Sequence, residues 1–268
     1  MLIGKDMNTK AHQYESMIPA ERRQELLKML QEQEIVTIVE LMDKFKVSHM
    51  TIRRDLQKLE ENGLLTQVTG GAQLFKRILT EPSHLQKELL NSEEKNAIGQ
   101  YAASLIPPHS CIYLDAGTTS LALCNYITDR SDLTVVSNDF EVINFLVNQN
   151  IGDLIHTGGL VQKENRSGIG HLAAQTISSL SFDISFISAS SWELRGITTP
   201  DRDKVAVKQA VARVSRQRIL ISDSSKYGQT ATYLAVPMSD ITCIITDNKL
   251  PEHGQKMLGK LDLKVVMV

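Results

Sequence analysis

Apolar residues recur at every third or fourth position in three short stretches near the start of the chain, which predicts three short helices. The first helix begins at Pro19, because proline is favoured in the first turn. Thr37 can cap the second helix and Ser48 the third, since a side-chain oxygen accepts from the free amides of a first turn. The third helix, predicted at residues 48–62, ends before Gly63, a favoured left-handed residue. Its apolar stripe consists of Ile52, Leu56 and Leu59.

A strand-like run at residues 64–69 follows the third helix. Gly70 and Gly71 can turn the chain, and residues 72–74 can return as a second strand. Because a tight turn joins the second and third helices, the pattern predicts a helix-turn-helix followed by a hairpin wing. In such a motif the later helix enters the major groove of DNA. We therefore predict a DNA-binding domain at residues 18–76.

Strand-like and helix-like stretches alternate from residue 93 to residue 268, which is typical of a doubly wound α/β sheet. The predicted fold class is therefore α/β, with an N-terminal winged helix-turn-helix domain before this larger domain. Residues 77–92 contain Pro82 and show no clear period, so we expect a linker there. We expect residues 1–17 to form a flexible tail. The seven predicted strands are 111–116, 133–138, 153–158, 184–189, 218–223, 241–247 and 263–268.

Composition places the chain in an ordinary class. It has 268 residues, of which 42% are hydrophobic and 22% charged, and this predicts about two globular domains. No apolar run is long enough to span a membrane or to form the core of a signal peptide. Three cysteines lack the spacing of a metal or redox motif, which favours buried free thiols. We expect a cytoplasmic protein without a cofactor or a metal site.

Charge supports DNA binding only locally. The net charge of −2 gives no overall signal for nucleic acid. Between Asp43 and Lys58, however, five basic residues stand against two acidic ones. Phosphate contacts supply much of the affinity for DNA and do not require a basic whole domain.

The outer face of the third predicted helix carries the candidate DNA contacts. Arg53 and Arg54 can each bond two acceptors of a phosphate or a guanine edge. Met50 can contact a thymine methyl group, with core packing as the alternative. Asp55 is expected to pair with an arginine, because phosphate repels a carboxylate. A plain surface helix with solvated charges is the simpler interpretation of this stretch alone. The candidate DNA-binding residues are Ser48, His49, Met50, Thr51, Arg53, Arg54, Lys58, Gly70 and Gly71.

Polar residues follow the predicted strands of the second domain, where doubly wound sheets bind their ligands. After the first strand comes Asp115-Ala116-Gly117-Thr118-Thr119-Ser120, which leads directly into a helix. Free amides at that helix start would form an anion pocket suited to phosphate. Turns of this kind are also rich in glycine and threonine for geometric reasons alone. Further candidates at the strand ends are Ser137, Asn138, Gly158, Gly159, Lys204, Asp223 and Lys226.

Both domains resemble the DeoR family of bacterial transcriptional regulators. In the first domain the resemblance rests on Glu21-Arg22-Arg23, Leu26-Leu27, Val47-Ser48, residues 51–56, Leu59, Gly63 and Gly70-Gly71-Ala72. In the second it rests on residues 115–119, Ser137-Asn138, Gly158-Gly159 and residues 223–226. The family's effector domain is similar in fold to ribose-5-phosphate isomerase and CoA-transferase subunits. Its effectors are typically phosphorylated sugars or sugar derivatives.

The resemblance implies roles for single residues. Gly117, Thr118 and Thr119 would hold a phosphate, and Lys204 and Lys226 would supply positive charge. The side chains that would bond the sugar hydroxyls are those of Asp115 and Asn138. One departure from the family pattern lies at residues 188–192. Many members have a glycine-containing turn there, whereas in this sequence the stretch contains no glycine and its last residue is Trp192. The indole implies either a differently shaped pocket or a lid packed on the sheet edge.

The implied function is transcriptional regulation. The resemblance predicts a repressor of a sugar or sugar-acid catabolic operon that binds double-stranded operator DNA. It also implies a phosphorylated sugar-type effector and a dimer or tetramer. The alternative is a sugar-phosphate isomerase with a DNA-binding head, in which Asp115, Asp223, Lys204 and Lys226 would transfer protons. An isomerase needs a carboxylate base against the substrate carbon, and no strand end offers a clear second carboxylate.

Overall fold

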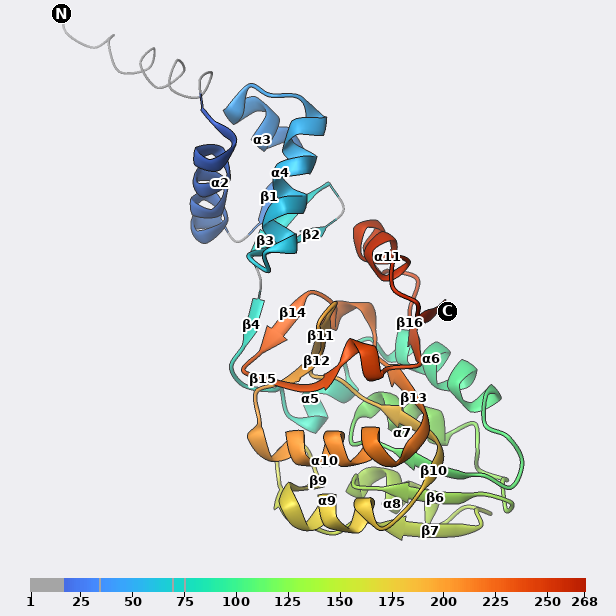
Figure 1. Cartoon of the computed structure of the whole chain (residues 1–268). Coiled ribbons are helices and arrows are strands. Elements are labelled where there is room, and N and C mark those ends of the chain that lie inside the picture. Colours follow the sequence, from blue (N-terminus) through green and yellow to red (C-terminus); the bar gives the residue numbers. More distant parts are fainter. Residues whose placement is uncertain (1–16, 34, 69, 75) are drawn as a thin grey trace, which may run out of the picture. The chain divides into compact units, whose positions relative to one another are not determined.

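The computed structural model describes residues 17–33, 35–68, 70–74 and 76–268, and these divide into two compact units (Figure 1). The first unit comprises the chain up to Lys76 and also Pro251–Gln255, and the second comprises Arg77–Leu250 and Lys256–Val268. The tail that we predicted at residues 1–17 lies outside the described residues except for Met17.

Up to Lys76, the described residues of the first unit form three helices and a small antiparallel sheet. The sheet has the strand order β1-β3-β2, so the hairpin of β2 and β3 is the predicted wing. Strand β1 extends it by pairing Val36 with Ala72. The bounds are α2 (Pro19–Gln33), β1 (Ile35–Thr37), α3 (Ile38–Phe45), α4 (His49–Glu61), β2 (Leu65–Val68) and β3 (Gly71–Leu74).

Local capping fixes where α3 and α4 begin and end. Thr37 forms a reciprocal capping box with Glu40, in which the Thr37 backbone N–H donates to Glu40 Oε2 at 2.8 Å. The backbone N–H of Thr51 donates to Ser48 Oγ at 3.3 Å, and so Ser48 caps α4. After α4, Gly63 adopts a left-handed φ of +68°. The predicted caps and the glycine stop are confirmed.

The three helices share one apolar core with the sheet. On α4 the buried apolar side chains are Ile52, Leu56 and Leu59, which form the predicted stripe. Burying each such side chain contributes about 1.5–3 kcal/mol relative to leaving it in water. The other members of this core are Leu26, Met29, Leu30, Val36, Ile38, Leu41, Phe45, Leu65 and Ala72.

A seven-stranded parallel sheet organises the second unit, with the order β17-β16-β13-β10-β5-β6-β7. Every neighbouring pair in it is parallel. All seven predicted strands are present, although two begin a few residues earlier than expected. The bounds are β5 (Cys111–Leu114), β6 (Thr134–Ser137), β7 (Asp153–His156), β10 (Phe182–Ile187), β13 (Ser215–Ile221), β16 (Cys243–Thr246) and β17 (Lys264–Met267).

Helices cover both faces of this sheet, as a doubly wound fold requires. Alternation along β5 shows the two faces: Ile112 and Leu114 belong to one hydrophobic core, and Tyr113 belongs to the other. The first core includes α6 (Ser92–Ser104), α7 (Thr118–Cys124) and α8 (Phe140–Leu146). The second includes α9 (Gly170–Ser178) and α10 (Arg202–Val214), which lie side by side in Figure 1.

The strand order reverses between β5 and β10. From β5 the chain continues outward to β6 and β7, whereas from β10 it continues the other way to β13, β16 and β17. Such a reversal opens a crevice at the carboxyl ends of the two central strands, where doubly wound folds bind ligands. In this chain the crevice is flanked by Asp115 and Ser188, the residues that follow these strands.

Several smaller elements were not predicted. Residues 77–92, which we expected to be a linker, contain helix α5 and belong to the second unit. Three further small sheets pair β12 with β11 and β15, β8 with β9, and β4 with β14. The bounds are β4 (Lys76–Ile78), α5 (His84–Glu88), β8 (Leu160–Gln162), β9 (Ser167–Ile169), β11 (Ser191–Glu193), β12 (Gly196–Thr199), η1 (Ser224–Lys226), β14 (Gln229–Ala231), β15 (Tyr233–Pro237), η2 (Met238–Asp240) and α11 (Glu252–Leu258).

Trp192 lies on β11 and is fully buried. Its indole packs edge-on against the ring of Tyr227, with ring centroids 4.9 Å apart. The indole is therefore part of the hydrophobic core, which favours the packed alternative over an open pocket wall. Among the described residues, no helix has both the length and the apolar character needed to cross a membrane.

Candidate DNA-binding surface and effector site

The outer face of α4 presents an exposed set of polar and basic side chains. His49, Arg53, Arg54 and Lys58 are exposed: Arg54 and Lys58 lie opposite the buried stripe, and His49 and Arg53 lie on its flanks. Met50 is 59% exposed, which excludes the alternative that it packs in the core. A helix with one buried and one basic, exposed face can lie in the major groove without losing its own core contacts.

Two guanidinium groups on this face are available for a partner. Within the described ranges, neither Arg53 nor Arg54 forms an ion pair or a side-chain hydrogen bond. Lys58 is less free, because its ammonium lies 3.4 Å from a carboxylate oxygen of Glu61. Arg53 and Arg54 are therefore the groups on α4 that best fit phosphate or guanine.

Asp55 faces the interior of the first unit and pairs with two arginines of α2, as predicted. Arg22 Nε donates to Asp55 Oδ2 at 2.5 Å, and an amino group of Arg23 donates to Asp55 Oδ1 at 3.2 Å. The Asp55 and Arg22 side chains are both buried. This ion pair joins the outward-facing helix to α2 and so fixes its orientation in the unit.

The two wing glycines have different environments. Gly70 is exposed, has a left-handed φ of +79° and has no atom near the position of a Cβ. Gly71 is buried, and a Cβ there would lie 2.2 Å from the carbonyl oxygen of Val36 on β1. Gly70 can therefore approach a DNA backbone, whereas Gly71 is required for the close packing of β3 on β1.

Replacing Gly71 by alanine is expected to lower the stability of the first unit by about 1–3 kcal/mol, because the added methyl group forces β1 and β3 apart. Replacing Gly70 by alanine places a side chain in left-handed backbone, at a cost of about 1–2 kcal/mol, without any clash. Denaturant unfolding followed by circular dichroism measures both values. A Gly71→Ala chain as stable as wild type would contradict the close approach.

The second unit gathers polar groups at the β5–β10 crevice. The Asp115 carboxylate accepts from the Ser188 backbone N–H at 3.0 Å and from its hydroxyl at 3.1 Å. It also accepts from the ammonium of Lys208 on α10, which in turn donates to the Ser188 carbonyl oxygen at 2.7 Å. Lys208 was not predicted. The carboxylate and the ammonium are both buried, so each needs the other as its counter-charge.

The loop after β5 is held by residues that follow β6. Asn138 Oδ1 accepts from the Tyr113 hydroxyl at 2.8 Å and from the Ala116 N–H at 3.0 Å. The Asp139 carboxylate accepts from the Gly117 N–H at 2.8 Å, and burial raises its pKa to about 6. Ser137 is fully buried and donates to the carbonyl oxygen of Leu114, so this residue supports the sheet.

Helix α7 begins at Thr118, directly after this loop. No side chain of the described residues caps its first turn, so the amides of Thr118, Thr119 and Ser120 keep their donor capacity. The Ser120 hydroxyl is buried and lacks a hydrogen-bond partner among the described residues. Unused donors at a helix start favour a negatively charged ligand.

The glycines after β7 are explained by backbone conformation at Gly158 and by conformation and packing at Gly159. Gly158 and Gly159 have left-handed φ values of +69° and +108°. A Cβ on Gly159 would lie 2.7 Å from the carbonyl oxygen of Ile169, and one on Gly168 would lie 2.1 Å from that of Gly158. The fold therefore requires these glycines where the β8–β9 hairpin crosses, and their contact with a ligand stays a prediction.

Glu81, from the expected linker, occupies the neighbourhood of Lys204. Its carboxylate lies 2.7 Å from the Lys204 ammonium and 3.4 Å from the Lys87 ammonium, and it accepts from the Ser190 hydroxyl. Burial opposes ionisation of Glu81, but Lys204 and Lys87 outweigh it and lower its pKa to about 2. Burial lowers the pKa of Lys87 to about 8, against the opposing effect of Glu81.

Asp223 and Lys226 follow β13 in the chain, and Asp223 contacts Asn91, the residue directly before α6. Asp223 Oδ1 accepts from the side-chain amide of Asn91 at 2.9 Å, and Lys226 Nζ lies 3.8 Å from Asp223 Oδ2. Lys95 on α6 is close enough for Lys226 to affect it: burial and then Lys226 lower the pKa of Lys95 to about 8. Lys226 therefore interacts electrostatically with both Asp223 and Lys95.

Five ammonium groups and three carboxylates thus share one region of the second unit. The lysine cluster, as we name it, contains Lys87, Lys95, Lys204, Lys208 and Lys226, with Glu81, Asp115 and Asp223. These eight groups sum to +2 when all are ionised, and the carboxylates of Glu88 and Glu94 also act on Lys95. Helical spacing could have revealed Lys208, since it follows Lys204 by four residues on α10. No sequence signal pointed to Glu81 or Lys87.

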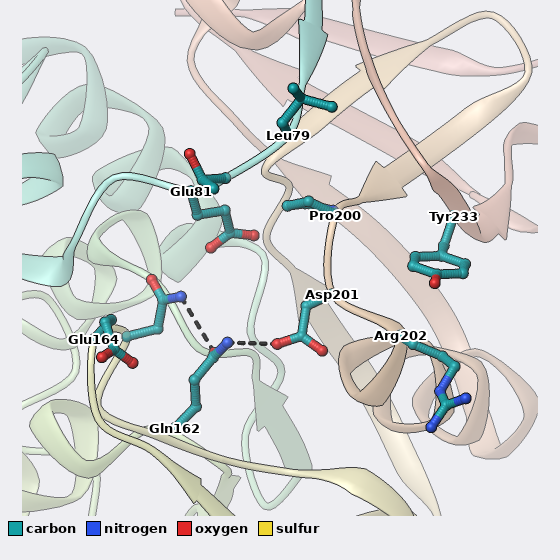
Figure 2. A pocket seen from close by; sticks show the side chains of 10 residues that line it. Leu79, Glu81, Gln162, Glu164, Pro200, Asp201, Arg202 and Tyr233 are labelled. Carbon is teal, nitrogen blue, oxygen red and sulfur yellow. Dashed lines mark hydrogen bonds between the residues drawn. The ribbon is translucent and has the colours of Figure 1, made fainter.

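A cavity of about 380 Å³ opens beside this cluster. Figure 2 shows Glu81 pointing into it, with Asp201 and Arg202 across from it at the start of α10. Gln162 donates a hydrogen bond to Asp201 along another side. The cavity therefore gives solvent and small molecules a route toward Glu81. Its lining residues are Leu79, Thr80, Glu81, Gln162, Glu164, Asn165, Pro200, Asp201, Arg202 and Tyr233.

A winged helix-turn-helix joined to an α/β domain with a cationic crevice defines a DNA-binding regulator with a sensor domain. Family models agree with both parts. Residues 22–77 match the DeoR-like helix-turn-helix domain, and residues 90–248 match the DeoR C-terminal sensor domain. The chain belongs to the DeoR family of transcriptional regulators, and its first domain binds DNA.

Relatives extend the match over almost the whole chain. It is 53% identical over 251 residues to the uncharacterised HTH-type transcriptional regulator YgbI of Escherichia coli K12, covering 94% of this chain and 98% of the relative. It is 30% identical over 249 residues to the transcriptional repressor AccR of Agrobacterium fabrum, covering 92% and 96%. The chain is therefore a transcriptional regulator and not the isomerase of the alternative.

One similar solved structure is a ribose 5-phosphate isomerase from Plasmodium falciparum. It has 15% sequence identity and a TM-score of 0.37, and the match covers 50% of this chain and 52% of that one. The α/β fold class rests on the sheet of the chain itself.

Proposed function

We propose that this regulator represses a sugar or sugar-acid catabolic operon and responds to a phosphorylated sugar or sugar acid. The observation that carries this proposal is the lysine cluster, whose excess positive charge lies at the crevice of the sheet. A phosphate or carboxylate group would neutralise that excess. The relative AccR, a transcriptional repressor, supports the sign of regulation.

In the proposed complex, the free amides of Thr118 and Thr119 bind the phosphate, with Gly117 at the loop before them. Lys204 and Lys226 supply positive charge. Hydroxyl groups of the effector meet Asp115 and Asn138, which would exchange present hydrogen bonds for the new ones.

The proposed DNA complex needs more than one copy of the chain. A two-fold operator is read by two recognition helices about 34 Å apart, and a single chain supplies one. We therefore propose a homodimer or homotetramer that places two α4 helices on double-stranded operator DNA in the bacterial cytoplasm.

Replacing Lys226 by alanine or Thr118 by valine is expected to leave operator binding intact and to raise the effector concentration needed for release about tenfold or more, the equivalent of about 1.4 kcal/mol. A thermal-shift screen of phosphorylated sugars and sugar acids first identifies the effector, because a ligand of the folded state raises the melting temperature. Titrating it into an operator-binding assay then compares the variants.

Arg216→Ala is the matched control for the effector site. Arg216 is exposed on β13 near the amino end of the strand, the edge of the sheet opposite the crevice. Its loss removes one positive charge without touching the proposed site. An unchanged effector response in both Lys226→Ala and Thr118→Val would place the ligand elsewhere.

A further inference from the structure

Glu81 holds the position that an anionic ligand of the lysine cluster would take. Its side chain is 8% exposed, and its carboxylate meets the ammonium groups of Lys204 and Lys87. Lys208 also acts on this carboxylate through space. A phosphate that approached Lys204 through the cavity would meet Glu81 first, because Glu81 lines that cavity.

We propose that Glu81 is a built-in competitor of the effector: its carboxylate occupies Lys204 and Lys87 until an effector anion displaces it. The proposal deepens the function proposed above and rests on it. Two negative groups cannot share the same two ammonium groups without strong repulsion, so the anion and Glu81 bind in turn. Displacement would free the chain segment that carries Glu81.

That segment, residues 79–91, is held to the second unit by polar contacts, one of which is the hydrogen bond from the His84 N–H to the Glu164 carbonyl oxygen at 2.8 Å. Lys87 donates to Asn165. Lys95 donates to the carbonyl oxygens of Lys87 and Leu90. Asn91 donates to Asp223. A change in the orientation of Lys87 and Lys95 would therefore weaken several of these hydrogen bonds together.

The segment gains little from apolar packing. Leu79, Leu85, Leu89 and Leu90 are each more than half exposed. His84 is buried, and neither of its ring nitrogens has a hydrogen-bond partner among the described residues. Burying an unpaired polar ring opposes docking, so docking depends strongly on the ion pairs of Glu81. Such a segment can exist in two positions that a ligand can select between.

The position of this segment in the chain gives the exchange a regulatory consequence. Arg77, where the second unit begins, directly follows the first unit, and Glu81 stands four residues later. Release of residues 79–91 would leave the pairing of β4 with β14 as the remaining anchor of the connection between the DNA-binding unit and the sensor unit. In this way an anion at the crevice would change the restraint on the first unit without touching it.

The test uses the full chain and inorganic phosphate as the probe. Glu81→Gln is expected to bind phosphate about tenfold more tightly than wild type in calorimetry, if Glu81 occupies the ammonium groups about nine-tenths of the time. Hydrogen exchange of amides 79–91 is expected to be faster in Glu81→Gln without phosphate. In wild type, phosphate is expected to speed it.

Glu164→Gln is the matched control, because Glu164 lines the same cavity but its carboxylate has no ion pair among the described residues. It is expected to match wild type in both measurements. Equal phosphate affinity and equal exchange in Glu81→Gln and wild type would overturn the competitor role. The proposed anion site would still stand in that case if wild type binds phosphate and Lys204→Met binds it more weakly.

Absence of phosphate binding in wild type and in Glu81→Gln would overturn both proposals. Binding to Glu81→Gln alone would support the competitor role most strongly, since it would show an anion site that Glu81 normally closes. An equal gain of phosphate affinity in Glu164→Gln would show that removing any negative charge from the cavity has this effect. It would overturn the proposal that the anion displaces Glu81 from its lysines.

Discussion

Replacing Arg53 and Arg54 together by alanine is expected to weaken operator binding by about 10²- to 10⁴-fold. Each guanidinium that bonds a guanine edge contributes about 1–3 kcal/mol, and neither of the two has an ion-pair partner in the part of the chain that the structure describes. The variant keeps its fold, since both side chains are exposed and neither joins the core. Fluorescence anisotropy with operator DNA measures the loss, and thermal melting checks the fold.

The salt dependence of binding separates the two possible roles of these arginines. If they bind phosphates, the slope of log affinity against log salt falls by about 0.9 for each lost contact. If they read bases, the slope stays and discrimination between operator and random DNA falls. Lys28→Ala is the matched control, because Lys28 is an exposed cation on α2 of the same unit. Tight and specific binding by the double variant would contradict our assignment of α4.

Replacing Asp55 by alanine is expected to cost about 3–5 kcal/mol of stability in the first unit. The change leaves the Arg22 guanidinium buried without its counter-charge and removes the partner of Arg23. A domain of this size has on the order of 3–9 kcal/mol in total, so much of its stability would be lost. Operator binding is then lost through unfolding, although Asp55 faces away from the DNA-binding surface.

Asp43→Ala is the control for this result, because Asp43 is exposed on α3 and carries the same charge. It is expected to change stability by less than about 0.5 kcal/mol. Urea unfolding monitored by circular dichroism and effector-induced thermal shifts distinguish the two units: Asp55→Ala should destabilise the first and leave the sensor response of the second. Wild-type stability in Asp55→Ala would show that the ion pair contributes nothing.

Much of the fold was predictable because local rules decide it. Thr37, Ser48 and Gly63 carry the chemistry of helix starts and stops, which acts within a few residues. The seven sheet strands were visible as apolar runs, since a parallel sheet is buried on both faces. Short strands such as β11 and β12 were missed, because their pairing joins residues whose partners the sequence pattern does not reveal.

The candidate sites divide in the same way. The exposed face of α4 follows from helical periodicity once Ile52, Leu56 and Leu59 are assigned to the core, so Arg53 and Arg54 were found. The pairing of Asp55 was also foreseen, because a carboxylate near DNA needs a cation. The different tasks of Gly70 and Gly71 were not, since only the close approach of β1 makes Gly71 indispensable.

By itself, the sequence determined the two-domain plan, the DNA-binding helix and the polar ends of the strands, because these depend on periodicity and on short-range chemistry. Only the tertiary structure decided which charges meet. Glu81 and Lys204 are 123 residues apart, and Asp115 and Lys208 are 93 apart. Electrostatic pairing depends on distance in space, and only the packing of α5 and α10 around the sheet brings these groups together.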